Sequence, residues 1–169
     1  MAKGLYIGAT KPHAGKNMFC IGLGLRLQKE GLNLGYMKPV GTMPIECNGE
    51  NGDEDAFFVQ DVLGLDQPAS QVSPVLITQD FKIRAFAGQE KDYLPDIQKA
   101  YGELGADKDL MLVSGAKNGR SGKYCGLDGI RIIRELGLKT IVVDRLGHEV
   151  SYDELLGIKE LLGDLMLGT

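Results

Sequence analysis

The sequence has few cysteines, and their spacing fits neither a metal site nor a redox pair. Cys20, Cys47 and Cys125 are the three cysteines among 169 residues, and no two of them form a CxxC pair. A sparse, odd number of cysteines is typical of reduced thiols in a cytoplasmic protein. We therefore expect a cytoplasmic location.

Long apolar runs and an excess of positive charge are also missing. No run approaches the ~18 apolar residues of a membrane-spanning helix, and the N-terminal residues lack the apolar core of a signal peptide. The net charge is −4, from 19 basic and 23 acidic residues, whereas proteins that bind duplex nucleic acid are more often basic. We expect neither a membrane nor a nucleic acid as a partner.

Apolar periodicity along the chain alternates between strand and helix. Strands are expected at residues 5–8, 34–37, 109–114 and 139–143, and helices at residues 16–30, 53–63, 93–104 and 127–136. In the first helix, Phe19, Leu23 and Leu27 are expected to form the apolar face. Residues 67–78 are expected to be an irregular connector, because Pro68 and Pro74 disfavour regular structure.

The end of the chain predicts two further elements. Ser151 is expected to be the N-cap of a last helix, with Glu154 completing a capping box. Residues 165–167 are expected to start a last strand, and His148, before the helix, is expected to be structural.

Two of the expected strands, residues 110–113 and 140–143, are apolar throughout. Such strands are buried on both faces, so the sequence predicts a mostly parallel sheet covered by helices on both sides. Ligands of such folds bind beyond the carboxyl ends of the strands. This rule points to residues 8–16, 38–42, 114–123 and 144–147.

A candidate phosphate loop occupies residues 8–17, between the first strand and the first helix. In this context backbone N–H groups and the helix N-terminus face an anion, and a lysine reaches the outer phosphates. The alternative is a plain strand–turn–helix corner, and a loop histidine such as His13 is often merely exposed. The residues expected to bind a nucleotide are Lys11, His13, Ala14, Gly15, Lys16, Asn17 and Met18.

Four segments resemble a known family in its order along the chain: residues 6–16, 35–42, 53–65 and 139–145. The sequence is similar to the dethiobiotin synthetase-like P-loop family, and most of all to the P-loop domain that begins some phosphotransacetylases and DRTGG-domain proteins. The resemblance implies one nucleotide-binding domain over residues 1–169 with a three-layer α/β/α P-loop NTPase-like fold. In the family a further strand and an adenine-contacting loop follow the position of Thr169.

The resemblance also assigns roles to individual residues. Lys16 matches the lysine that neutralises the phosphates, and Lys38 matches one that contacts the reacting intermediate, so both are catalytic candidates. Lys11 matches a lysine that reaches across a homodimer. Asp55, with Asp53, matches a magnesium-binding carboxylate. From the residues alone, the alternatives are that Lys38 is a solvated lysine before a turn proline and that Asp55 complements a helix dipole.

Two departures from the family pattern concern the metal. Asn17 replaces a Ser or Thr whose hydroxyl binds magnesium, and Ser114 stands where the family has a glutamate. The loss of two oxygen ligands argues against ordinary metal-assisted phosphoryl transfer and makes magnesium doubtful. In the next loop, Lys117, Arg120 and Lys123 are either a solvated surface or an anion site that offsets phosphate charge without a metal.

Two functions therefore remain open. The first is a weakly catalytic or regulatory module, expected to be a homodimer, that binds ATP, another phosphate-bearing nucleotide or phosphate. The second is an ATP-dependent enzyme that activates a carboxylate by phosphorylation. Asn17 and Ser114 favour the first function, whereas the presence of Lys16, Lys38 and Asp55 supports the second.

Overall fold

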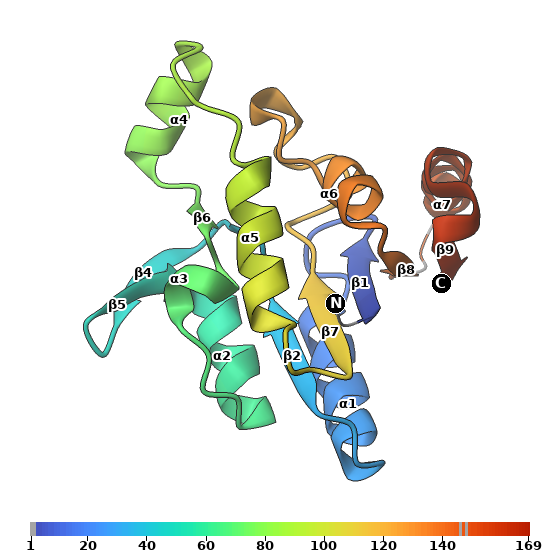
Figure 1. Ribbon diagram of the computed structural model, residues 1–169. Coiled ribbons are helices and arrows are strands. Elements are labelled where there is room, and N and C mark those ends of the chain that lie inside the picture. The colour runs from blue at the N-terminus through green and yellow to red at the C-terminus, as the bar shows by residue number, and fades with distance from the viewer. Residues whose placement is uncertain (1–2, 146, 148) are drawn as a thin grey trace.

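A parallel five-stranded sheet forms the centre of the computed structural model, which describes residues 3–145, 147 and 149–169 (Figure 1). The strand order is β2-β7-β1-β8-β9, and every neighbouring pair is parallel. The predicted strands are all present, including the short last one. Their bounds are Lys3–Ala9 for β1, Leu34–Met37 for β2, Leu110–Ser114 for β7, Lys139–Val143 for β8 and Met166–Gly168 for β9.

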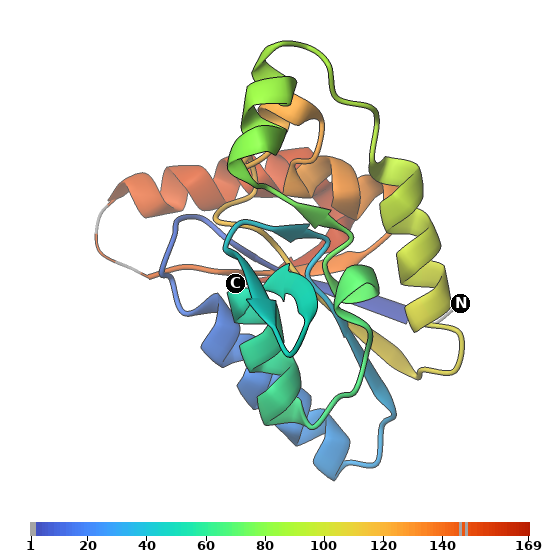
Figure 2. The ribbon, with the colours of Figure 1, turned by 90° about the vertical axis from the view of Figure 1, so that its left-hand side faces the viewer.

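Helices cover both faces of this sheet (Figures 1 and 2). Because crossovers between parallel strands are right-handed, the direction of each crossover decides which face its helix covers. The β1-to-β2 crossover runs one way across the sheet, and the later crossovers run the other way. The helix of the first crossover, α1 (Lys16–Lys29), therefore covers one face, and the helices α5 (Leu94–Leu104), α6 (Gly129–Leu136) and α7 (Glu149–Leu162) of the later crossovers cover the other. Helix α2 (Glu54–Leu63) belongs to the long connection between β2 and β7, but it packs against α1 on the first face. The predicted three-layer α/β/α fold is confirmed.

A second group of small elements lies between α1 and α5 in the chain. Strands β3 (Val40–Gly41) and β6 (Val75–Leu76) pair in parallel, and β4 (Pro44–Cys47) and β5 (Glu50–Asp53) form an antiparallel hairpin. Helices α3 (Ala69–Val72) and α4 (Gln79–Phe86) complete the group, and short 3₁₀ turns, η1 (Lys123–Cys125) and η2 (Gly163–Leu165), follow later.

The prediction that residues 67–78 are irregular is wrong, because this segment contains α3 and β6. Pro68 is the N-cap of α3, and Pro74 stands directly before β6. Proline has no backbone N–H to donate, but a residue at the start of a helix or just before a strand does not need this donor. The two prolines therefore mark the boundaries of short elements.

The buried face of α1 also differs from the prediction. Phe19 is exposed, whereas Cys20, Ile21 and Gly24 are the buried residues of this helix. A β-carbon on Gly24 would lie 2.7 Å from a methyl carbon of Leu63, so the glycine lets α1 approach α2 closely. Leu23 and Leu27 are half-buried and pack against the core as predicted, so of the predicted apolar face only Phe19 is wrong.

Helix starts depend on capping side chains. Asp53 caps α2 by accepting a hydrogen bond from the Ala56 N–H, and Asp128 caps α6 in the same way through Arg131. The prediction that Ser151 is an N-cap is wrong: α7 spans Glu149–Leu162, and Ser151 lies buried inside it. His148 lies outside the described residues, so its predicted role stays a prediction.

None of the helices in the described ranges is long and apolar enough to cross a membrane.

Candidate phosphate-binding site

The loop between β1 and α1 stands at the centre of the sheet's carboxyl edge. β1 lies between β7 and β8, and the crossovers on its two sides run in opposite directions. A crevice at such a reversal is where open α/β sheets bind ligands. Gly15 adopts a left-handed conformation, with φ of 96°, and Lys16 directly begins α1. The chain therefore turns so that the N-terminus of α1 faces the loop.

A pocket of about 290 Å³ opens beside this helix N-terminus. It brings together all seven residues predicted to bind a nucleotide, from Lys11 to Met18, and adds Lys38, Asp55 and Lys117 from three other segments. Backbone N–H groups at a helix start, with lysine side chains around them, attract an anion. The pocket has the size and charge for a phosphate group.

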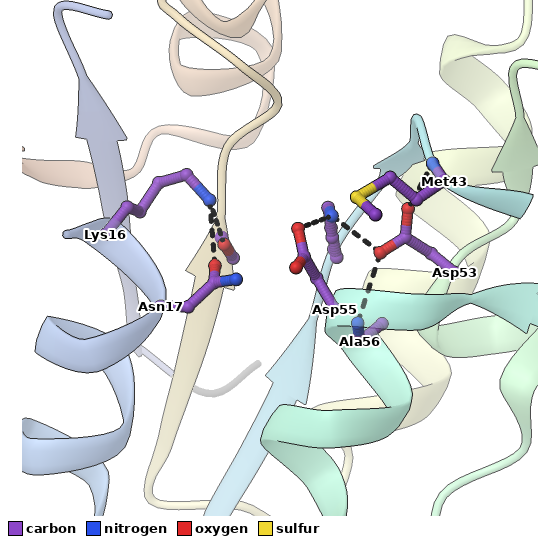
Figure 3. Close-up of polar contacts among 8 residues, drawn as sticks. Lys16, Asn17, Met43, Asp53, Asp55 and Ala56 are labelled. Atoms are coloured by element: carbon purple, nitrogen blue, oxygen red, sulfur yellow. Dashed lines mark hydrogen bonds and ion pairs between the residues drawn. The ribbon is translucent and has the colours of Figure 1, made fainter. Parts of the chain in front are cut away.

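Lys16 has two neutral oxygen partners in this pocket. Its Nζ lies 2.9 Å from Oγ of Ser114 and 3.2 Å from Oδ1 of Asn17 (Figure 3). Burial, and after it the charge of nearby Lys38, lowers the pKa of Lys16. The two residues that depart from the family pattern therefore both contact the loop lysine.

Lys38 forms a buried ion triad. Its Nζ lies 2.6 Å from Oδ1 of Asp53 and 2.7 Å from Oδ2 of Asp55 (Figure 3). Only 1% of Lys38 is exposed, so the alternative of a solvated lysine is wrong. Asp53 also accepts hydrogen bonds from the backbone N–H groups of Met43 and Ala56. Asp53 therefore has a structural role at the start of α2, away from the pocket surface.

Asp55 is the carboxylate that reaches the phosphate pocket, with 33% of its side chain exposed. Burial alone would raise the pKa of Asp55, but the hydrogen bond and charge of Lys38 outweigh it, so this pKa lies below its usual value. Asp55 is thus ionised at neutral pH and held by Lys38.

The predicted metal ligands do not form a larger acidic cluster. Within residues 3–145, 147 and 149–169, no group of three His, Cys, Asp or Glu residues is arranged to hold a metal ion. Asp53 and Asp55 both contact Lys38, as described above. A role of these carboxylates in binding magnesium stays a prediction.

Lys11 is held by its own chain. Its Nζ lies 3.6 Å from Oδ1 of Asp144 and 3.4 Å from Oγ of Ser151. The Thr10 hydroxyl donates a hydrogen bond to the same carboxylate oxygen of Asp144. Sequence reasoning missed Thr10, Asp144 and Ser151 as partners of this loop. The position of Asp144 just after β8 was the available signal, because β8 lies beside β1.

The basic loop after β7 borders several pockets. Lys117 lines the phosphate pocket and also a neighbouring cavity, which Arg120 and Lys123 line with it. Arg120 lines a further cavity with Thr10 and Lys11 of the phosphate loop. An anion site formed by these three cations stays a prediction.

The parallel sheet and the glycine–lysine loop at its carboxyl edge define a P-loop protein. The chain belongs to the P-loop family described as an AAA domain, whose profile matches residues 3–164.

Curated relatives agree with the resemblance seen in the sequence. The chain is 27% identical to an ATP-dependent dethiobiotin synthetase of Methanococcus vannielii, over 66% of this chain and 50% of that protein. It is also 27% identical to one from Clostridium kluyveri, over 94% of this chain and 72% of the relative. A phosphate acetyltransferase of Pseudomonas aeruginosa matches at 27% identity, over 85% of this chain but 20% of that enzyme. The chain thus spans half the length of the first relative and a fifth of the acetyltransferase.

A solved structure supports the fold. The kinase domain of the Escherichia coli tyrosine kinase ETK aligns with a TM-score of 0.59, covering 98% of this chain and 65% of that chain. The identity is 12%, so this likeness concerns the fold alone.

Proposed function

We propose that this domain binds the phosphate groups of a nucleotide, with ATP the first candidate, and that its role is regulatory or weakly catalytic. The helix N-terminus, Lys16 and Lys117 supply positive charge in one pocket, which supports phosphate binding. Two of its relatives are named as ATP-dependent enzymes, which supports ATP as the ligand.

One observation carries the regulatory role. Every oxygen-bearing side chain at the positions linked to magnesium contacts a lysine: Asn17 and Ser114 contact Lys16, whereas Asp53 and Asp55 contact Lys38. Phosphoryl transfer depends on a metal that bridges the phosphates and neutralises developing charge. An ammonium group attracts the same phosphates, but it does not bridge them as an octahedral cation does.

The second candidate is an ATP-dependent enzyme that activates a carboxylate. The observation that favours it is the joint presence of Lys16, Lys38 and Asp55 in one pocket. Magnesium-dependent phosphate release from ATP that is abolished in Lys16→Ala would support this enzyme over a regulatory domain.

Calorimetric titration with ATP tests the binding itself. Lys16→Ala is expected to weaken ATP binding at least about tenfold, or ~1.4 kcal/mol, because a charge-assisted contact is lost. Lys29→Ala is the matched control, since Lys29 is exposed at the other end of the same helix. Equal affinity in the wild type and Lys16→Ala would exclude the phosphate loop as the binding site.

We also propose a homodimer in the cytoplasm. The matching position of Lys11 in the related dimeric proteins supports the dimer. The free state of Cys20, Cys47 and Cys125 fits the location.

A further inference from the structure

A second cavity, of about 390 Å³, adjoins the phosphate pocket. The two share Thr42, Ala116 and Lys117 in their linings. The walls of the second cavity come from the β3–β6 pair, from α4 and from the loop of residues 116–124. Figure 2 shows α4, at the top of the view, beside the loop that contains η1. We call this cavity the basic pocket.

The charge of the basic pocket is of one sign. Lys82, Lys117, Arg120 and Lys123 line it, and no Asp or Glu does. Arg120 stands at its border, because it also lines a cavity with Lys11 and Glu154. Within the described part of the chain, none of these four side chains takes part in an ion pair, although the protein carries a net charge of −4. Cations that converge on a concave surface repel one another and raise the local concentration of anions. The pocket therefore suits a ligand with more than one negative charge.

The inner wall of the basic pocket is apolar. Val40 and Ile77 line it and are themselves almost fully buried. Tyr124 forms another wall and stacks on Phe86 of α4, with ring centroids 5.0 Å apart and an interplanar angle of 14°. This stacking orients the aromatic ring and links the loop to α4. A purely inorganic anion would leave the exposed ring of Tyr124 in water, so the pocket suits an anion with an apolar body.

The loop that carries three of the cations is held by its own hydrogen bonds. Oδ1 of Asn118 accepts from the Arg120 N–H and from the Ser121 hydroxyl, and the Asn118 N–H donates to Oγ of Ser121. Gly122 has φ of 94°, and a β-carbon there would lie 2.7 Å from the carbonyl oxygen of Leu127. The backbone is thus fixed before a ligand arrives, which reduces the entropy lost on binding.

We propose that the basic pocket binds a small organic polyanion, with carboxylate or phosphate groups on an apolar body, beside the phosphate loop. This site is independent of the proposed nucleotide site, although Lys117 borders both. A ligand in the basic pocket would therefore lie next to phosphates bound at Lys16, as a second substrate or a regulator would.

Calorimetry on the full chain with 2,6-naphthalenedicarboxylate, a planar aromatic dianion, tests the proposal. This probe is expected to bind the wild type more tightly than inorganic sulfate, which lacks an apolar body, and than neutral 2-naphthol. Arg120→Gln with Lys123→Gln is expected to weaken binding about tenfold or more, ~1.4 kcal/mol. Tyr124→Ala is expected to weaken it as well. 1-Naphthyl phosphate, compared with the dicarboxylate, identifies the preferred anionic group.

Two controls separate this site from its neighbour. Lys29→Gln removes the same charge far from the pocket and is expected to leave probe affinity unchanged. Lys16→Ala tests the phosphate pocket, and its probe affinity is also expected to stay near that of the wild type. All substituted side chains of the basic pocket are exposed, and circular dichroism confirms that each variant is folded.

Several outcomes would overturn the proposal. One is that neither naphthalene anion binds, and another is that sulfate binds as tightly as the naphthalene probe. A third is that the Arg120→Gln, Lys123→Gln variant keeps the wild-type affinity for the probe, and the last is that Lys16→Ala loses its affinity for the probe. The last result would place the probe in the phosphate pocket. Failure of the proposed nucleotide function is distinguishable, because it appears as absent ATP binding while the naphthalene probe still binds.

Discussion

The ammonium nitrogen of Lys38 lies 2.6 Å from Oδ1 of Asp53, and 2% and 0% of the two side chains are exposed. Asp53 also accepts the N–H groups of Met43 and Ala56, so its carboxylate joins the segment after β3 to the start of α2. Lys38 extends this link to Asp55 at the phosphate pocket. One lysine therefore serves both the packing of this region and the charge of the site.

Lys38→Met is expected to destabilise the protein by ~3–5 kcal/mol, because breaking a buried ion pair leaves the Asp53 carboxylate without its cation. The measurement is urea unfolding followed by circular dichroism. Lys38→Met combined with Asp53→Asn is expected to recover part of the loss, and Lys29→Met is the control for removing an exposed lysine. A loss no larger in Lys38→Met than in Lys29→Met would contradict the structural role of the pair.

The Asp55–Lys38 contact predicts a pH dependence of stability. The pKa of Asp55 is lower in the folded protein than its unfolded value, which is ~3.9 for an ordinary aspartate. As pH falls, the unfolded chain therefore takes up this proton before the folded protein does. The stabilisation from Asp55 is complete above the unfolded pKa, and it is lost as pH falls through the folded pKa. Asp55→Asn is expected to be less stable than the wild type at pH 7, with the difference shrinking in acid.

Urea unfolding of both proteins between neutral and acidic pH measures this difference. Glu54→Gln is a matched control in the same turn of α2, because Glu54 is exposed and forms no ion pair within the described residues. A gap between the wild type and Asp55→Asn that stays constant down to the most acidic pH would show that the charge of Asp55 does not stabilise the fold.

The sheet and the phosphate loop were predictable because their signals are local. The apolar runs of β7 and β8 indicate buried parallel strands, and Gly15 and Lys16 follow β1 directly. The hairpin β4–β5 was missed although Asn48 and Gly49, with φ of 52° and 82°, carry the Asn-Gly signal of a two-residue turn. Its strands are short and have few apolar residues, so no apolar alternation marks them.

The contacts of the site were harder to predict, because they join distant parts of the chain. Lys16 meets Ser114 across 98 residues, and Lys11 meets Ser151 across 140. The sequence shows that Ser114 replaces the glutamate of the related family. Only the fold shows that the Ser114 hydroxyl is a partner of the loop lysine, Lys16. Likewise Lys38 reads as a solvated lysine until the hairpin brings Asp53 back to it.

A homodimer is the expected state in solution. Light scattering at micromolar concentration is expected to give twice the monomer mass of 18.3 kDa. If Lys11 reaches a phosphate of the partner subunit, it must leave Asp144 and Ser151, and Lys11→Ala then weakens ATP binding without changing the mass. Scattering from an 18.3 kDa particle alone would contradict the dimer, and unchanged affinity in Lys11→Ala would contradict the role of this lysine.

ATP binding is expected to depend little on magnesium. Asn17 and Ser114 supply no charge for a metal, and the ammonium of Lys38 lies between Asp53 and Asp55. Lys11, Lys16 and Lys117 line the same pocket, and cations that converge in this way oppose a divalent metal and attract the bare polyanion. Affinity is therefore expected to fall as salt is added, since screening weakens exposed charges.

The measurement is ATP affinity in excess EDTA and again in excess magnesium, with Asn17→Ser as a companion variant. In the wild type the two affinities are expected to agree within about tenfold, ~1.4 kcal/mol. Asn17→Ser restores a hydroxyl that magnesium prefers, so any gain from magnesium should be larger in this variant. A gain of more than tenfold in the wild type would mean that Asp53 and Asp55 release Lys38 to bind the metal. The carboxylate-activating enzyme would then become the better account of this site.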